Sequence, residues 1–215
     1  MRWQASALIS CILWIGACAS YTDQTAQMRS SFRMQDYESS LQQLQNSEIS
    51  ETKRNRLLYH LEKAMILDRM NEKAKSRKLL SRASQIADEL YIVSISKTAA
   101  TFLVNESIQD YHGEDYEIVA IHTLSALSFL ETGDYKAARV EAKKINNKLY
   151  TITKERDNSH NHYREDAFAR FLSGLIYEAL GDLDDAIIDF KKALDLYQSR
   201  KFKPFYVGSI PQPLI

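Results

Sequence analysis

Apolar side chains recur every three or four residues along most of this 215-residue chain, which is the spacing of an amphipathic helix. From about residue 28 onward one such segment follows another, and no stretch alternates apolar and polar residues for long. Glycine and proline occur only six and three times, and two of the prolines, Pro211 and Pro213, stand near the C-terminus. Pattern and composition together predict an all-α fold.

One helix–turn–helix pattern is clearest between Ala167 and Tyr197. Its defining residues are Gly174, Tyr177, Gly181, Ala186, Phe190 and Ala193. Small residues leave room where two helices cross closely, and the aromatic side chains fill the space beside that crossing. Gly181 suits the turn because glycine accepts a positive φ. The spacing resembles that of a tetratricopeptide repeat, which implies a pair of antiparallel helices.

The same spacing recurs upstream with decreasing fidelity. One further copy has Ala126, Phe129, Gly133, Ala138, Ala142 and Ile145, a weaker one has Ala64, Leu67, Asn71, Ser76, Leu80 and Ala83, and a degraded one has Phe32, Asp36, Tyr37, Ser40 and Leu44. Any single copy would also fit a generic helical hairpin, but turn chemistry shared between copies favours a repeat. We expect tetratricopeptide-like helical hairpins stacked as a short solenoid.

The distances between the copies predict additional structure. The turns at Asn71, Gly133 and Gly181 are 62 and 48 residues apart, whereas tetratricopeptide repeats follow one another about every 34 residues. We therefore expect an inserted helix near Glu89–Val104 and a polar loop from about Thr153 to Arg164.

Stacked hairpins curve, and the first helix of each unit lines a concave groove. The groove candidates are Thr123, Leu127 and Leu130 from the middle unit, Phe168, Phe171, Leu175 and Glu178 from the last, and Leu61, Met65 and Asp68 from the earlier one. An equally weighted alternative is that the apolar candidates belong to the core, covered by the inserted helix. The stretch from Asn105 to His112 is expected to be irregular and to line a surface groove.

The first 17 residues have the layout of a secretory signal. Arg2 precedes an apolar run that ends at Ile15 and is too short for a comfortable bilayer span of about 20 residues. The run leads into Ile15-Gly16-Ala17-Cys18, which resembles the lipobox of bacterial lipoproteins. The resemblance implies cleavage before Cys18 and lipid on its sulfur. The alternative is an ordinary signal peptide with a chance cysteine.

Cysteine content agrees with the lipobox, because Cys11 would be removed with the signal and lipid would cap Cys18, the only other cysteine. In enterobacterial lipoproteins an Asp after the cysteine favours the inner membrane, so Ala19 indicates the outer membrane, facing the periplasm. The domains expected are a lipoprotein signal peptide at 1–17, a lipidated tether at 18–27, a tetratricopeptide-like helical domain at 28–200 and an irregular tail at 201–215.

Three stretches of the chain together resemble a narrower family. They are residues 57–65, residues 99–106 leading to 111–117, and residues 167–182. They are similar to bacterial tetratricopeptide-repeat lipoproteins of uncharacterised function. Members usually continue with a further C-terminal region, so a chain that stops soon after Pro211 resembles a short or C-terminally truncated member. The resemblance implies a fold and a location but no reaction.

Charge changes the picture little. The chain has 28 basic and 28 acidic residues, and loss of Arg2 with the signal would leave 27 basic ones. A net charge near zero gives no electrostatic reason to expect nucleic acid as a partner. We expect no nucleic acid and no small-molecule substrate. The expected partners are the membrane, through the N-terminal lipid, and another envelope protein or peptide.

Candidate chemistry is sparse. No GxSxG, Walker A or dinucleotide motif occurs. The run Gly113–Glu117 could be a carboxylate cluster for acid–base chemistry or a cation, but we favour a helix start, where acids lie near the positive end of the helix dipole. A second acidic run is interpreted as a solvated helix face. It consists of Asp182, Asp184, Asp185 and Asp189.

The histidines point to no metal. His160 and His162 lie in the polar loop and would need a third ligand to hold zinc, so a solvated loop is the default. His60, His112 and His122 are expected to be packed or capped rather than catalytic. We therefore expect no metal, no cofactor and no catalytic residue.

These features predict a membrane-anchored lipoprotein that acts as a non-catalytic helical-repeat scaffold in the bacterial envelope. Two alternatives stay open. The protein could be an accessory or activator subunit of a cell-wall or envelope-assembly enzyme, and it is less readily an enzyme itself.

Overall fold

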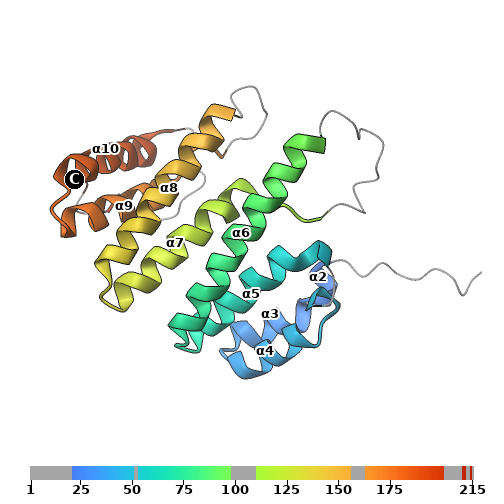
Figure 1. The fold of residues 1–215 in the computed structure, drawn as a ribbon. Coiled ribbons are helices and arrows are strands. Elements are labelled where there is room, and N and C mark those ends of the chain that lie inside the picture. Colours follow the sequence, from blue (N-terminus) through green and yellow to red (C-terminus); the bar gives the residue numbers. More distant parts are fainter. Residues whose placement is uncertain are drawn as a thin grey trace, which may run out of the picture.

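The computed structural model describes residues 21–50, 53–97, 110–155 and 163–200, together with Ile210, Pro211 and Leu214. The predicted signal peptide, Cys18, residues 98–109, most of the polar loop and most of the tail lie outside the described residues. The described segments form helices joined by short connections (Figure 1).

The described residues contain nine α-helices, α2 to α10. Their bounds are α2 Tyr21–Gln24, α3 Ala26–Arg33, α4 Tyr37–Gln45, α5 Arg56–Arg69, α6 Lys73–Lys97, α7 Asp115–Glu131, α8 Tyr135–Glu155, α9 Ala167–Ala179 and α10 Leu183–Gln198. Two 3-10 turns, Glu48–Ser50 and Lys53–Asn55, separate α4 from α5.

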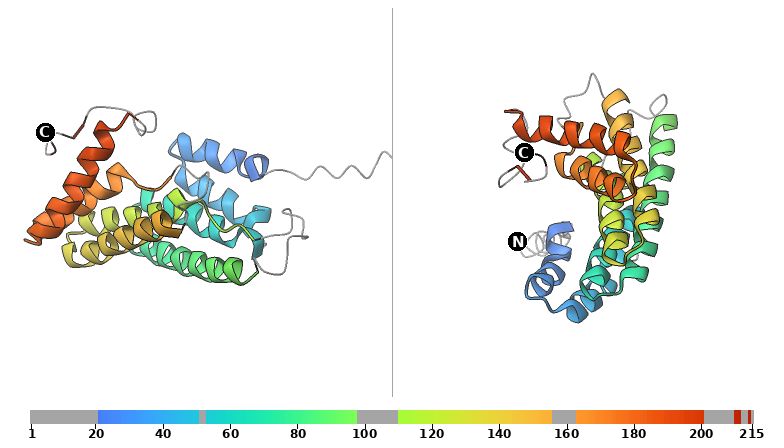
Figure 2. Two further views of the ribbon diagram at one scale, coloured as in Figure 1. Left: turned by 90° about the horizontal axis from the view of Figure 1, so that it is seen from above. Right: turned by 90° about the vertical axis from the view of Figure 1, so that its left-hand side faces the viewer.

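Consecutive helices pair as hairpins, α3 with α4, α5 with α6, α7 with α8 and α9 with α10. Neighbouring hairpins pack through α4 on α5, α6 on α7 and α8 on α9. The stack is curved, since in the right-hand view of Figure 2 α2 and α10 lie towards one side of it and α6 lies on the other. The structure thus confirms the predicted all-α, tetratricopeptide-like stack of hairpins.

The same turn closes the first helix of each hairpin. Its central residues, all with φ between 64 and 78°, are Gln35, Asn71, Gly133 and Gly181. At Gly133 the backbone N–H donates to the carbonyl of Leu130 at 3.0 Å, and the N–H of Asp134 donates to that of Phe129 at 2.9 Å. This is the Schellman pattern, which satisfies carbonyls that the helix end leaves without partners. The other three turns repeat it, so even the degraded first copy is a genuine hairpin.

At least one small residue lies where the two helices of each hairpin cross. The four pairs, each twelve residues apart, are Met28 with Ser40, Ala64 with Ser76, Ala126 with Ala138, and Gly174 with Ala186. In the first two hairpins the serine hydroxyl donates to the carbonyl opposite, from Ser40 to Met28 at 3.0 Å and from Ser76 to Ala64 at 2.8 Å. The weaker copies therefore keep the close crossing and also satisfy a buried hydroxyl.

The crossing in the last hairpin leaves no room for a side chain at Gly174. A Cβ atom added at Gly174 would lie only 2.5 Å from the Phe190 ring. Phe190 packs in turn against Phe171, with ring centroids 6.0 Å apart. The remaining residues that define the pattern lie in or against the core, with Ala126, Ala138, Tyr177, Ala186 and Ala193 buried and Phe129 packed against the same cluster.

Part of the segment expected to be a tether at 18–27 is helical. The helix α2 covers Tyr21–Gln24, and α3 begins at Ala26 and packs against α4. Tyr21, Thr25 and Met28 recur at the three- and four-residue spacing of a helix face, and Thr25 and Met28 are buried. These three residues form the inner face of a segment whose composition is otherwise polar.

The inserted helix expected near Glu89–Val104 does not begin as a separate element. Residues 89–97 are the C-terminal end of α6, which runs unbroken for 25 residues, and residues 98–104 lie outside the described part. Neither glycine nor proline interrupts α6, and its buried face continues past the hairpin through Ile86 and Leu90. The extra spacing between copies is thus partly taken up by a longer helix.

Gly174→Ala should destabilise the protein although alanine is the better helix former. The added methyl group meets the Phe190 ring, and overpacking of this kind costs about 1–3 kcal/mol against roughly 1 kcal/mol gained in helix propensity. Urea unfolding measures the difference, and the same substitution in a Phe190→Leu background is the control. An equal effect in both backgrounds would contradict the tight crossing.

Candidate functional site

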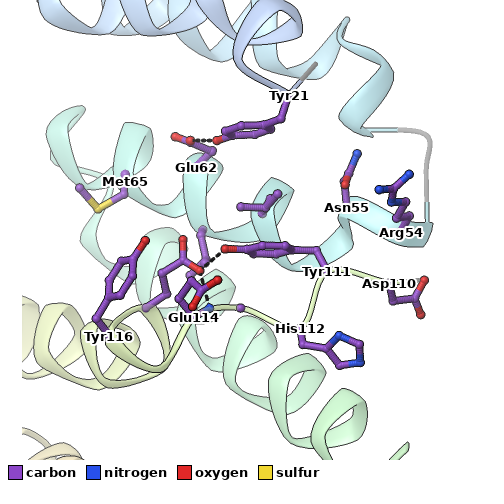
Figure 3. Close-up of a pocket in the computed structure, with 14 residues that line it drawn as sticks. Tyr21, Arg54, Asn55, Glu62, Met65, Asp110, Tyr111, His112, Glu114 and Tyr116 are labelled. Carbon is purple, nitrogen blue, oxygen red and sulfur yellow. Dashed lines mark hydrogen bonds between the residues drawn. The ribbon is translucent and has the colours of Figure 1, made fainter. Parts of the chain in front are cut away.

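A cavity of about 770 Å³ lies between α2, α5 and the N-terminal end of α7 (Figure 3). Leu58, Leu61 and Met65 of α5 form its apolar part, and three tyrosines, Tyr21, Tyr111 and Tyr116, contribute rings. Leu61 and Met65, two of the expected groove residues, therefore line a real concavity. Residues 110–112, from the stretch expected to line a groove, also line this one.

Two hydrogen bonds between tyrosine and glutamate fasten the walls of the cavity. The Tyr21 hydroxyl of α2 donates to Glu62 of α5, and the Tyr111 hydroxyl donates to Glu117 of α7 (Figure 3). Burial and the adjacent carboxylates raise the pKa of both tyrosines, so their hydroxyls stay protonated and remain donors. The first bond holds α2 against α5, and the second holds the connecting segment against α7.

The acidic run at the entrance to α7 is a helix start, as predicted. The helix begins at Asp115, with Asp115 and Glu117 in its first turn. The backbone N–H of Glu114 donates to the Glu117 carboxylate at 2.9 Å, which satisfies one of the amides at the helix entrance. Two acids of this run, Glu114 and Glu117, also line the cavity. One short segment thus supplies both a helix cap and part of a site.

Charge in the cavity is predominantly negative. Four carboxylates line it, from Glu62, Asp110, Glu114 and Glu117, against the single guanidinium of Arg54 and the imidazole of His112. Figure 3 shows Arg54 and Asp110 at one end, whereas Glu62 and Glu114 lie towards Met65 and Tyr116. The excess negative charge therefore lies beside the apolar and aromatic part.

The other groove candidates are distributed between core and surface. Thr123 is buried, and its hydroxyl donates to the Val119 carbonyl of its own helix. Leu127 and Leu130 are partly buried against the core cluster that α7, α8, α9 and α10 share. Asp68 pairs with Lys73 at 3.0 Å.

In the last hairpin the candidates stay closer to solvent. Phe168 is 48% exposed and Glu178 is exposed, whereas Leu175 and Phe171 are partly buried. The first helix of this unit therefore presents an exposed aromatic residue and a carboxylate. Their role in binding stays a prediction.

A buried ionic network near the last hairpin was not expected from the sequence. Arg170 of α9, 3% exposed, lies 3.0 Å from Asp189 of α10 and forms two hydrogen bonds with Glu165. Asn146 of α8 joins the network at both ends, accepting from Arg170 at 2.7 Å and donating to Asp189 at 2.6 Å. Burial raises the pKa of Asp189, while Asn146 and the charge of Arg170 oppose the shift. The network ties three helices together.

The interpretation of Asp189 as part of a solvated acidic face is therefore wrong. Asp184 and Asp185 are exposed as expected, but Asp189 is 1% exposed. It follows Ala186 by three residues and precedes Ala193 by four, which places it on the buried face of α10. This periodicity could have identified it, had its charge been set aside.

His122 is packed, as predicted. It is 2% exposed, and its Nδ1 lies 2.7 Å from Glu141 of α8. Burial raises the pKa of Glu141, but hydrogen bonds from His122 and Lys144 outweigh burial and lower that pKa below its ordinary value. Ser84 of α6 lies 3.5 Å from the other ring nitrogen. The pair thus bridges α7 and α8 next to α6.

His60 and His112 were also expected to be packed or capped. His60 Nδ1 lies 2.6 Å from the Arg56 carbonyl of its own helix, and His112 lines the cavity. Among the described residues no group of three or more His, Cys, Asp or Glu side chains could hold a metal ion. His160 and His162 lie outside the described residues.

Comparison with known proteins finds a match in the last hairpin. A family model described as tetratricopeptide repeat matches residues 169–200, which covers most of α9 and all of α10. No curated protein and no solved structure matches the chain. The match falls on the copy whose pattern is clearest, and it supports a tetratricopeptide-like protein.

Asp189→Ala should destabilise the protein, though by less than the roughly 3–5 kcal/mol of a fully uncompensated buried charge, because Arg170 loses Asp189 but keeps its two hydrogen bonds with Glu165. Chemical unfolding measures the loss. The double variant Arg170→Met/Asp189→Leu should be substantially more stable than Asp189→Ala, since it removes both charges. Asp185→Ala, at an exposed position of the same helix, is the control. Equal stability of Asp189→Ala and Asp185→Ala would contradict the buried network.

Proposed function

We propose that this protein is a lipid-anchored, non-catalytic scaffold that docks another protein or peptide of the bacterial envelope. The docking part is supported by the stacked hairpins and by the tetratricopeptide match at residues 169–200. Repeats of this kind present extended concave surfaces to partners. The observation that carries the proposal is the cavity between α2, α5 and α7, where apolar, aromatic and charged side chains converge.

The anchoring part rests on the N-terminal sequence. Ile15-Gly16-Ala17-Cys18 follows a short apolar run, and Cys18 is the only cysteine outside the predicted signal. No helix in the described part of the chain is long and apolar enough to cross a bilayer. In the proposal Cys18 carries acyl chains such as palmitate, and Ala19 directs the protein to the outer membrane. The bacterial tetratricopeptide proteins that the sequence resembles are likewise lipoproteins.

Cys18→Ser should abolish incorporation of a palmitate analogue and release the protein from the membrane fraction, because the thiol that receives lipid is gone. Metabolic labelling followed by fractionation measures both effects. Cys11→Ser is the matched control, since Cys11 lies within the predicted signal and should leave labelling unchanged. Equal labelling of the wild type and Cys18→Ser would overturn the anchor.

Docking in the cavity should be detectable by photo-crosslinking in intact cells. A photoreactive amino acid in place of Met65, which lines the cavity and is 36% exposed, should give a discrete adduct with a second protein. The same amino acid at the exposed Lys78 of α6 is the control. The absence of an adduct from position 65, or an identical adduct pattern from position 78, would contradict the proposal that a partner docks at this cavity.

A further inference from the structure

We propose that the cavity between α2, α5 and α7 binds a basic side chain, lysine or arginine, presented by the partner's peptide segment. This inference rests on the proposed docking function and specifies the chemistry of the partner. The partner would be cationic at the point of contact, because the cavity is locally acidic although this chain as a whole has a net charge near zero.

The charges around the cavity favour a cation. Arg54 lies near Asp110 at one end (Figure 3), so three carboxylates, of Glu62, Glu114 and Glu117, are left facing a space that contains no further lysine or arginine among its lining residues. A cleft lined by one sign of charge attracts the opposite sign. An acidic peptide, a phosphate or a free C-terminal carboxylate would meet repulsion here.

The shape and remaining lining distinguish a basic side chain from a simple ion. Leu61 and Met65 offer apolar surface for the aliphatic stem of lysine or arginine, whose charged head then reaches the carboxylates. Tyr21, Tyr111 and the 54% exposed Tyr116 place aromatic rings in the same lining. A cation within about 6 Å of such a ring is attracted to its face.

Tyrosine rings already accept cations elsewhere in this chain. The Lys63 ammonium lies 5.3 Å from the centroid of Tyr59, and the Lys154 ammonium lies 5.6 Å from that of Tyr150. In the cavity itself, the Arg29 guanidinium already lies 5.8 Å from the centroid of Tyr21 and donates to the Thr22 carbonyl at 2.8 Å, so the rings of Tyr111 and Tyr116 are the ones left for a partner's cation. The pairing of basic groups with tyrosine is therefore a contact that this fold makes repeatedly.

The carboxylates remain able to accept a cation. Glu62 and Glu117 each receive one tyrosine hydroxyl, and a carboxylate has about four acceptor sites. A neutral hydroxyl orients the carboxylate without cancelling its charge. The tyrosine–glutamate bonds thus prepare two acceptors at the cavity wall before a partner arrives.

The experiment uses the purified full-length lipoprotein and a short fluorescent lysine-rich peptide as the probe. Fluorescence anisotropy at low salt should show binding that acetylation of the lysines removes. Glu62→Gln/Glu114→Gln should weaken binding about tenfold, the loss expected for two charge-assisted contacts. Glutamine keeps an acceptor for the Tyr21 hydroxyl, so the fold is retained. Asp184→Asn/Asp185→Asn removes the same charge from exposed positions of α10 and should change binding less than twofold.

Several results would overturn the inference. They are equal binding of the acetylated peptide, preference for a glutamate-rich peptide, and equal losses in the two double variants. In cells, Glu62→Gln/Glu114→Gln should also reduce the adduct formed from position 65. An adduct that persists at full yield in that variant would contradict recognition of a basic side chain but would still support docking at the cavity. The absence of an adduct in every background would contradict docking itself.

Discussion

The close crossing of two helices at a pair of small residues is the contact on which this structure depends. In three hairpins of the described chain serine, alanine or glycine stands at both positions, twelve residues apart, and in the first hairpin Ser40 crosses opposite Met28. Because the helices of a hairpin lie this near each other, their apolar faces form one surface, and that surface is buried only when the next hairpin stacks on it. Crossing, stacking and curvature are therefore consequences of the same few side chains.

The hairpins could be predicted because their determinants are local. Turn residues such as Asn71 and Gly133 adopt positive φ, and even the degraded copy keeps the small Ser40 at the crossing, opposite Met28. The starts and ends of helices were harder to predict. The inner face of α2 and α3 begins with the half-buried Tyr21 and the buried Thr25 and Met28, and a polar composition concealed it.

The site was only partly predictable, for a different reason. The repeat template identified Leu61 and Met65, because their position on α5 follows from the hairpin. It could not identify the contact of Tyr21 with Glu62, which joins residues 41 apart in the chain. Arg170 and Asp189 were missed because charged residues are seldom buried unless they are paired, and the pairing arises only once α8, α9 and α10 have packed.

The early start of α2 determines how far the protein could stand from a bilayer. Only two residues separate Cys18 from Tyr21, and three residue steps of extended chain reach about 10 Å. With lipid on Cys18, Tyr21 and the cavity that it lines would therefore be held at the level of the lipid headgroups. A partner would have to approach along the membrane surface, and the charge of the surrounding lipids would add to that of the cavity in selecting it.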